Sequence, residues 1–306
     1  VYFDDTLASK NAGRRANDRL APPNITALGG FKTENGSWGG GGGVFRSWDD
    51  DRFRYLGGLG KVALNLDFYG TLDRPRSFDL EGVGLVQQLS MRLADTDWLV
   101  GGRYVLFKAE SNFGSNLPTS VRPRELDIDI GRLGLLINYD SRDNILTPTR
   151  GTFFETELSA ARGWLGSSWD FENIKARAFH YQPLGDAFVL GVRGDLQWAS
   201  DDTPFFALPF IALRGIPALR YQGERTTVVE TELRWHLTDR WAVVGFFGAG
   251  KAFDRSEEFT DAETFSSRGG GIRYLIARKL GLYAGIDIAR GPEERAVYLQ
   301  VGSAWR

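Results

Sequence analysis

The sequence predicts an all-β protein: an antiparallel up-and-down transmembrane β-barrel of about 14 to 16 strands. Many short segments alternate apolar and polar residues. Of the 306 residues, 38 are glycine and 13% are aromatic. A barrel strand turns only every second residue to lipid, and aromatic girdles mark the two membrane interfaces. No apolar run approaches the roughly 18 to 20 residues that a membrane helix needs.

The alternation can be followed within single segments. In residues 229–235, apolar side chains on one face oppose Glu230, Glu232 and Arg234 on the other. A soluble antiparallel sandwich would show the same period of two. Full charges on the polar face of strand after strand nevertheless favour a wet lumen. Fourteen strands are expected, near residues 25–35, 38–48, 53–69, 80–94, 97–110, 124–140, 151–163, 168–182, 186–200, 220–236, 240–253, 264–278, 280–290 and 294–305.

The chain divides into two unequal parts. Residues 1–24 are polar and without a clear period, and they are expected to form an N-terminal tail or short plug. Residues 25–306 are expected to form the barrel, with residues 202–224 as an inserted loop. No second domain is expected.

Composition excludes several classes of function. The net charge of −2 gives no electrostatic support for nucleic-acid binding. There are no cysteines and only two histidines, which excludes thiolate sites and leaves too few ligands for a histidine-based metal centre. No nucleophile–histidine–acid arrangement stands out. The sequence therefore predicts no enzymatic activity, no metal and no cofactor.

The segment 202–224 breaks the alternation. It is rich in proline and aromatic residues and contains Arg214-Gly215. One interpretation is a surface loop that closes over the barrel mouth. The other is a loop that folds into the lumen and inserts Arg214. A guanidinium in a confined lumen needs a carboxylate partner, and inward-facing Glu232 and Asp287, and also Glu230, are available.

Several motifs resemble one family. Leu213-Arg214-Gly215 looks like the Arg-Gly signature of the BamA/TamA outer-membrane assembly superfamily, which includes two-partner secretion transporters. The stretch from Tyr139 to Gly151 is similar to the family's Tyr-Asp-x-Arg-Asp to Pro-x-x-Gly hairpin. Its motif residues here are Asp140, Arg142, Asp143 and Gly151. The resemblance covers most of residues 25–305 and is strongest from residue 124 onward.

The chain departs from the family at two points. The family's loop arginine typically pairs with a strand glutamate and with an aspartate of a Phe-x-Asp-x-Gly motif. Gly248 stands where that aspartate is expected. The expected partner of Arg214 is therefore Glu232, with Asp287 in the role of the missing aspartate. Residues 1–24 are also too few for a periplasmic POTRA module. The resemblance therefore implies a POTRA-less form or an isolated barrel.

The resemblance implies a protein insertase or translocator in the outer membrane of a Gram-negative type of cell. Its partners would be outer-membrane lipids and a client β-barrel or secreted protein. In such proteins the first and last strands part, and a client strand pairs with the exposed edge. The expected seam joins residues 25–35, with Gly39, Gly40 and Gly41 directly after them, to the last strand ending at Trp305.

Two matters stay open from the sequence. Trp305 fits either an aromatic-terminated assembly signal or an interfacial anchor. The function also has alternatives: a passive pore or structural barrel, or a barrel that anchors or translocates a domain absent from this chain.

Overall fold

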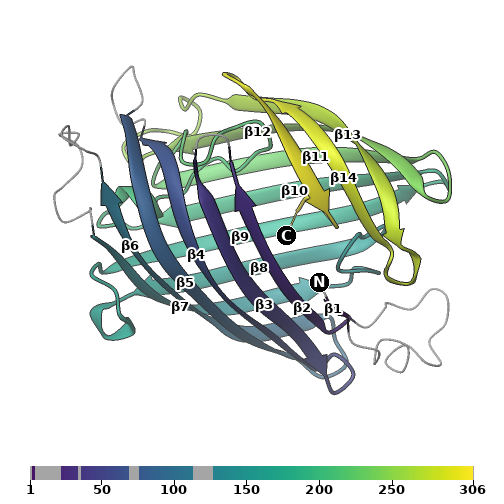
Figure 1. Ribbon diagram of the computed structural model, residues 1–306, viewed down its shortest axis with the longest axis horizontal. Helices are drawn as coiled ribbons and strands as arrows, with labels where there is room; N and C mark the ends of the chain where they lie inside the picture. Colours follow the sequence, from purple (N-terminus) through teal and green to yellow (C-terminus); the bar gives the residue numbers. More distant parts are fainter. Residues whose placement is uncertain (1, 4–21, 34–35, 69–75, 113–126, 306) are drawn as a thin grey trace.

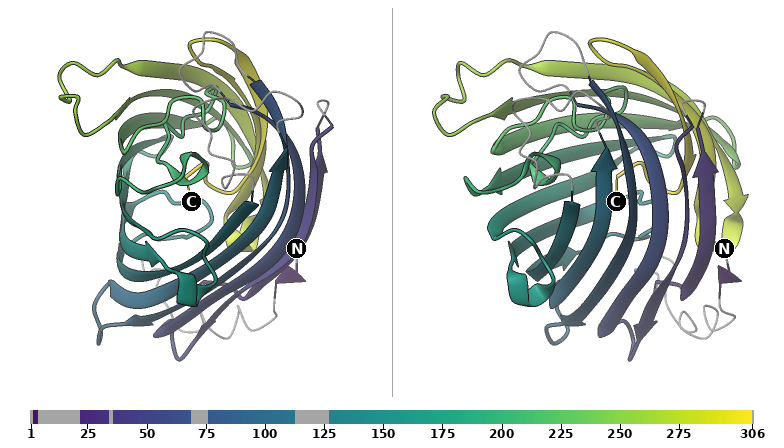
Figure 2. Two further views of the ribbon diagram at one scale, coloured as in Figure 1. Left: turned by 90° about the vertical axis from the view of Figure 1, so that its left-hand side faces the viewer. Right: turned by 60° about the vertical axis from the view of Figure 1, so that its left-hand side comes forward.

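In the computed structural model, which describes residues 2–3, 22–33, 36–68, 76–112 and 127–305, one antiparallel sheet curls into a barrel (Figures 1 and 2). Its strands follow each other in chain order, each paired with the next. They are β1 (Tyr2–Phe3), β2 (Ile25–Lys32), β3 (Trp38–Trp48), β4 (Phe53–Phe68), β5 (Arg76–Arg92), β6 (Trp98–Asn112), β7 (Asp127–Asp140), β8 (Gly151–Ala161), β9 (Phe171–Leu184), β10 (Phe188–Ala199), β11 (Arg225–His236), β12 (Trp241–Phe253), β13 (Phe265–Ala277), β14 (Leu282–Arg290) and β15 (Arg295–Val301). The predicted up-and-down topology and strand number are confirmed.

The fourteen expected strands correspond to β2 through β15, with ends that differ by a few residues. The two-residue β1 was not expected; it pairs with β2 at Ile25 and Thr26. The rest of the predicted N-terminal tail, apart from residues 22–24, lies outside the described residues. The division into a tail and a barrel therefore stays a prediction.

The two faces of the sheet differ as the alternation requires. Large apolar side chains point outward and are exposed, among them Leu59 (69%), Val297 (69%) and Leu299 (83%). Charged side chains such as Glu157 and Asp195 point inward and are buried. This arrangement suits a sheet with hydrocarbon outside and polar groups inside. In the described part of the chain, no helix is both long and apolar enough to cross a membrane.

Aromatic pairs mark one end of the barrel. Each pair joins neighbouring strands beside a short turn, and the ring centroids are 4.7 to 5.7 Å apart. The pairs are Trp48–Phe53, Trp98–Tyr139, Phe188–Trp235 and Trp241–Tyr274. The longer connections 200–224 and 254–264 lie at the other end. In outer-membrane barrels short turns face the periplasm and long loops face outward, so we refer to the short-turn end and the long-loop end.

Candidate functional site: a lumenal charge cluster and two open sheet edges

The inserted loop 202–224 carries Arg214 into the lumen. Its Nε and Nη2 donate to Oε1 of Glu230 at 2.9 and 2.7 Å. Its Nη1 donates to Glu232 at 2.8 Å and to Asp287 at 2.9 Å. The guanidinium carbon also lies 3.5 Å from the ring centroid of Phe246. The structure therefore brings Arg214 together with all three carboxylates that the sequence left open.

Further arginines and carboxylates extend this contact into a lumenal charge cluster. Arg273 binds both oxygens of Asp287, at 2.5 and 2.9 Å, and Arg193 bridges Asp195 and Glu230. Glu230 and Asp287 are almost fully buried, at 1% and 0% exposed. Buried carboxylates are tolerated when cations and donors compensate them. The members are Arg193, Asp195, Arg214, Glu230, Glu232, Arg273 and Asp287. Sequence reasoning missed Arg273, whose only signal was an inward position on β13.

Gly215 follows Arg214 because the backbone there excludes a side chain. Its φ is +88°, which favours glycine. A Cβ on Gly215 would lie 2.8 Å from the backbone nitrogen of Gly291, in the β14–β15 loop. The Gly215 N–H donates to the Tyr298 hydroxyl at 2.8 Å. These contacts fix the loop against the last two strands.

Gly248 makes room for the same loop. A Cβ on Gly248 would lie 2.6 Å from Cδ2 of Leu213, which is 4% exposed. Leu213 packs in an apolar cluster with Ile211, Ile216 and Val228. The position where an aspartate was expected therefore holds an apolar loop contact instead. Glu230, opposite Gly248 on β11, supplies the carboxylate.

The hairpin motif lies at the short-turn end. Asp140 is fully buried and accepts from Arg142 at 2.8 Å and from Arg54 at 2.7 Å. Asp143 holds its own turn by accepting from the Thr149 backbone at 3.0 Å. Gly151 has a φ of +99°, and a Cβ there would lie 2.4 Å from the Ser141 carbonyl oxygen.

The connection that carries this motif, residues 141–150, reaches other parts of the barrel. Asn144 donates to the Leu280 carbonyl at 2.7 Å, and Arg234 donates to the Pro148 carbonyl at 2.5 Å. These partners lie in the β13–β14 turn and on β11, at least three strands from β8 in the sheet. The connection therefore bridges the lumen at the short-turn end.

Trp305 corrects one expectation. It was expected at the end of the last strand, as an assembly signal or interfacial anchor. Instead β15 ends at Val301, Gly302 adopts a φ of +83°, and Trp305 is 4% exposed. Its Nε1 donates to Glu230 at 2.7 Å. Its ring packs among aromatic and aliphatic side chains, which are Phe153, Phe179, Tyr181 and Val189. The tail enters the lumen because the Glu230 carboxylate accepts the indole N–H there and the apolar cluster packs against the ring.

The expected seam needs correction only at its glycines, because its two strands, β2 and β15, lie at the ends of the sheet apart from the two-residue β1. Gly39, Gly40 and Gly41 lie on β3, which pairs along its length with β2 and β4. They are therefore one strand away from the edge, and the Phe31 ring covers Gly39. A run of glycines predicts weak side-chain packing, but it does not indicate whether the strand lies at the edge of the sheet or inside it.

The edges of the sheet are β2 and β15. Within the described residues, β2 has no partner beyond Thr26 on its outer side, and β15 has none beyond β14. Both ends of the sheet come round to the same side of the barrel (Figure 2). A strand with unpaired N–H and C=O groups can pair with another chain. The arrangement therefore suits strand addition.

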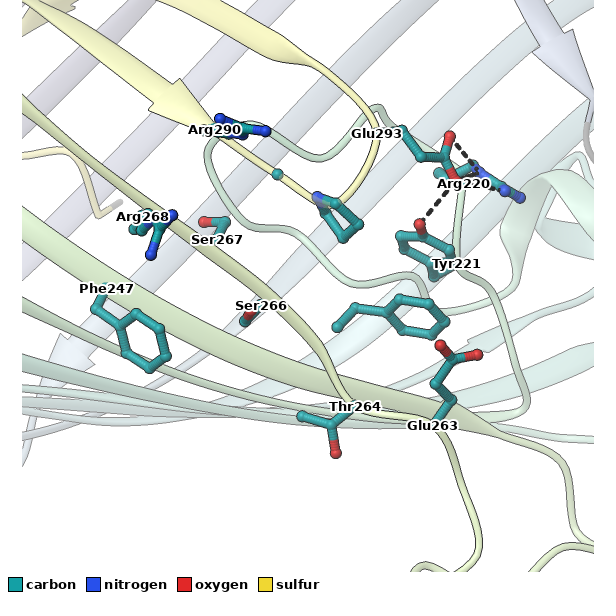
Figure 3. Close-up of a pocket in the computed structure, with 13 residues that line it drawn as sticks. Arg220, Tyr221, Phe247, Glu263, Thr264, Ser266, Ser267, Arg268, Arg290 and Glu293 are labelled. Atoms are coloured by element: carbon teal, nitrogen blue, oxygen red, sulfur yellow. Dashed lines mark hydrogen bonds and ion pairs between the residues drawn. The ribbon is translucent and has the colours of Figure 1, made fainter.

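A smaller ionic contact joins loop 202–224 to the β14–β15 loop at the long-loop end. Arg220 donates to Glu293 at 2.8 Å, and the Tyr221 hydroxyl donates to it at 2.8 Å (Figure 3). The Arg220 hydrogen bond lowers the pKa of Glu293 below its ordinary value. Burial and the contact with Glu293 raise the pKa of Tyr221 to about 12.

Comparisons with known proteins agree with this fold. Residues 61–211 match the Omp85 superfamily domain. No curated protein sequence matches the chain. BamA from Haemophilus ducreyi lacking POTRA domains 1–3 superimposes with a TM-score of 0.58 at 13% identity, over 90% of this chain and 63% of that one. CdiB from Escherichia coli gives 0.59 at 13%, over 94% and 60%.

CdiB from Acinetobacter baumannii gives a TM-score of 0.55 at 10% identity, over 91% of this chain and 59% of that one. The chain thus spans about three fifths of the length of these structures. At these identities the likeness establishes a shared barrel fold.

Proposed function

We propose that this chain is a member of the Omp85 superfamily, whose domain matches residues 61–211, and that it is the membrane barrel of a non-enzymatic protein insertase or translocator. Its location would be the outer membrane of a Gram-negative type of cell. The short turns and the lumenal tail would face the periplasm.

One observation carries the proposal: in the part of the chain that the structure describes, β15 has no partner beyond β14, and the outer side of β2 is paired only at Ile25 and Thr26. An isolated open edge is a liability for a membrane barrel, because lipid cannot satisfy backbone polar groups. A client strand that adds to β15 or β2 would satisfy them. The client would be an outer-membrane β-protein or a secreted chain crossing at the same place.

The lumen argues against the passive pore as the leading alternative. Loop 202–224 is tied to the charge cluster, residues 141–150 bridge the short-turn end, and Trp305 occupies the interior. Three segments from different parts of the chain therefore obstruct the path of a solute.

A cleavable cross-link between cysteines introduced on the two edges tests the proposal. The chain has no cysteines, so an introduced pair is unique. Gly29→Cys on β2 is tolerable because nothing lies within 4 Å of a Cβ there, and Val297→Cys on β15 replaces an exposed residue. The two are joined with bifunctional reagents of graded length. Assembly of a client barrel is then measured in proteoliposomes from its heat-modifiable migration on gels.

The matched control joins two strands that are already paired. Gly194 has open space around its Cβ, and it faces exposed Val229 across β10 and β11. Cross-linking Gly194→Cys to Val229→Cys should leave assembly unchanged, whereas the edge lock should abolish it until the link is cleaved. Full assembly by the locked edge pair would refute the proposal.

A further inference from the structure

Three arginines lie side by side on the outer face near the end of the sheet. Arg268 of β13 is directly opposite Arg290 of β14, and Arg290 is directly opposite Arg295 of β15. All three are exposed. Arg290 is the last residue of β14 and Arg295 the first of β15. The row therefore lies at the rim of the long-loop end.

This row is unfavourable without a counter-charge. Directly opposite side chains have Cβ atoms about 4.5 to 5.5 Å apart, and like charges in such pairs are destabilising. Among the described residues, no side-chain hydrogen bond or ion pair joins any of the three to a carboxylate. Elsewhere in this barrel, inward arginines such as Arg214 and Arg273 are paired with acids. The outer row stands apart from that pattern.

The nearby carboxylates bind other residues or make no contact with the three arginines. Glu293 binds Arg220 and Tyr221, and Glu263 lies at that same side of the cavity (Figure 3). Glu294, in the turn before Arg295, makes no side-chain contact with the three arginines in the part of the chain that the structure describes. The positive charge of the row is therefore open to an external anion.

An apolar surface continues below the arginines. Toward the short-turn end, the next outward row contains Ile288 opposite Val297, and the row after it contains Ile272, Ile286 and Leu299. These side chains are 43 to 83% exposed. An exposed apolar surface of this kind is stable only against lipid or a partner. The outer face of β13 to β15 is thus cationic at the rim and apolar beneath it.

A cavity of about 770 Å³ opens beside the row. Pairing between β13 and β14 stops at Arg268 and Arg290, while β13 continues to Phe265. Arg268 and Arg290 lie at one end of this cavity, away from the ion pair of Glu293 (Figure 3). Ser267 also lines it, and its buried hydroxyl has no hydrogen-bond partner among the described residues. The cavity therefore presents the guanidinium groups of Arg268 and Arg290 to an external anion.

We propose that Arg268, Arg290 and Arg295 form a binding site for the phosphate groups of an anionic lipid, whose acyl chains cover the apolar rows beneath. Guanidinium groups bind phosphate oxygens through paired, charge-assisted hydrogen bonds. The site goes beyond the proposed function; it rests on the membrane location proposed above and not on any client.

The test uses the full chain in a neutral maltoside detergent. Native mass spectrometry measures binding of dioctanoyl phosphatidic acid, of dioctanoylglycerol, which lacks the phosphate, and of inorganic phosphate. Phosphatidic acid is expected to bind at least about tenfold tighter than either, because both the charge and the chains contribute. Equal binding of inorganic phosphate would show a simple anion site and overturn the lipid assignment.

The variant Arg268→Gln/Arg290→Gln/Arg295→Gln should reduce phosphatidic acid binding to the level of dioctanoylglycerol. A control removes the same charge elsewhere: Arg255→Gln on a rim loop with Arg278→Gln and Lys279→Gln at the short-turn end, all exposed. It should retain full binding. Unchanged binding by the row variant, or an equal loss in the control, would refute the site. Because this readout needs no client, it is separate from the test of strand addition.

Discussion

The indole of Trp305 and the carboxylate of Glu230 meet in the lumen: Nε1 donates to Oε2 at 2.7 Å, while Oε1 of the same carboxylate accepts from Arg214. One acidic side chain thus joins the C-terminal tail to the inserted loop. Removing either donor should therefore disturb the other segment.

Trp305→Phe should loosen both segments. The ring pocket would stay filled, but Glu230 would lose a buried donor, which costs about 1 to 3 kcal/mol. Faster hydrogen exchange is expected at residues 302–305 and also at residues 211–216. Trp241→Phe, in the exposed aromatic pair with Tyr274, is the control and should leave both segments protected. Exchange confined to the tail would disprove the coupling.

Arg214→Ala should free the loop. It removes one of the two buried cations that contact each of Glu230 and Asp287, since Arg193 and Arg273 remain, a loss on the order of 3 to 5 kcal/mol. Protease cleavage within residues 202–224 should rise, and the folded band on unheated gels should convert at lower temperature. Arg240→Ala removes an exposed arginine at the short-turn end, where it donates to the Tyr274 hydroxyl, and should change neither. Identical cleavage in the Arg214 variant would mean that this residue does not anchor the loop.

Gly248→Ala should also weaken the loop, although it adds a single methyl group. The new Cβ would lie 2.6 Å from Leu213, and overpacking costs about 1 to 3 kcal/mol. Gly245→Ala, on the same strand with open space around its Cβ, should be neutral. In a Leu213→Ala background, which lacks the obstructing Cδ2, Gly248→Ala should cost much less than it does in the parent protein. An equal cost in both backgrounds would show that Leu213 is not the obstacle.

The contact between loop and rim should depend on pH. The pKa of Glu293 is lowered, so its contribution is complete above its ordinary value of 4.5 and is lost as pH falls below it through the folded pKa. The pKa of Tyr221 is raised to about 12, so its contribution is lost as pH rises from 10 towards 12. At pH 7, Glu293→Gln mimics the protonated acid and should increase tryptic cleavage after Arg220. Glu294→Gln is the control, and equal cleavage in both would count against the contact.

The sequence carried enough information for the fold because strand alternation is a local property. Successive residues of a strand point to opposite faces of the sheet. Segments such as Phe188–Ala199 could therefore be located without knowing which strands lie beside them. Turn ends were displaced by a few residues, since pairing rather than composition decides where a strand stops.

The site was harder to predict from the sequence because its contacts depend on distances between strands. Arg214 could be placed in the lumen as one of two interpretations, but its contact with all three inward carboxylates depends on the positions of β11 and β14 in the sheet. Trp305 looked like a strand end because nothing in its local pattern reveals the Glu230 acceptor 75 residues earlier. The glycines from Gly39 to Gly41 suggested weak pairing, yet sheet order puts them inside the edge.

The aromatic arrangement has a spectroscopic consequence. Six of the nine tryptophans are more than 40% exposed, and four of these belong to the paired aromatics at the short-turn end. Trp305 is screened from the bilayer by the wall of the barrel. Brominated acyl chains should therefore quench the fluorescence of the outward indoles and spare that of Trp305. The unquenched fraction becomes an optical signal for whether the tail is seated or withdrawn.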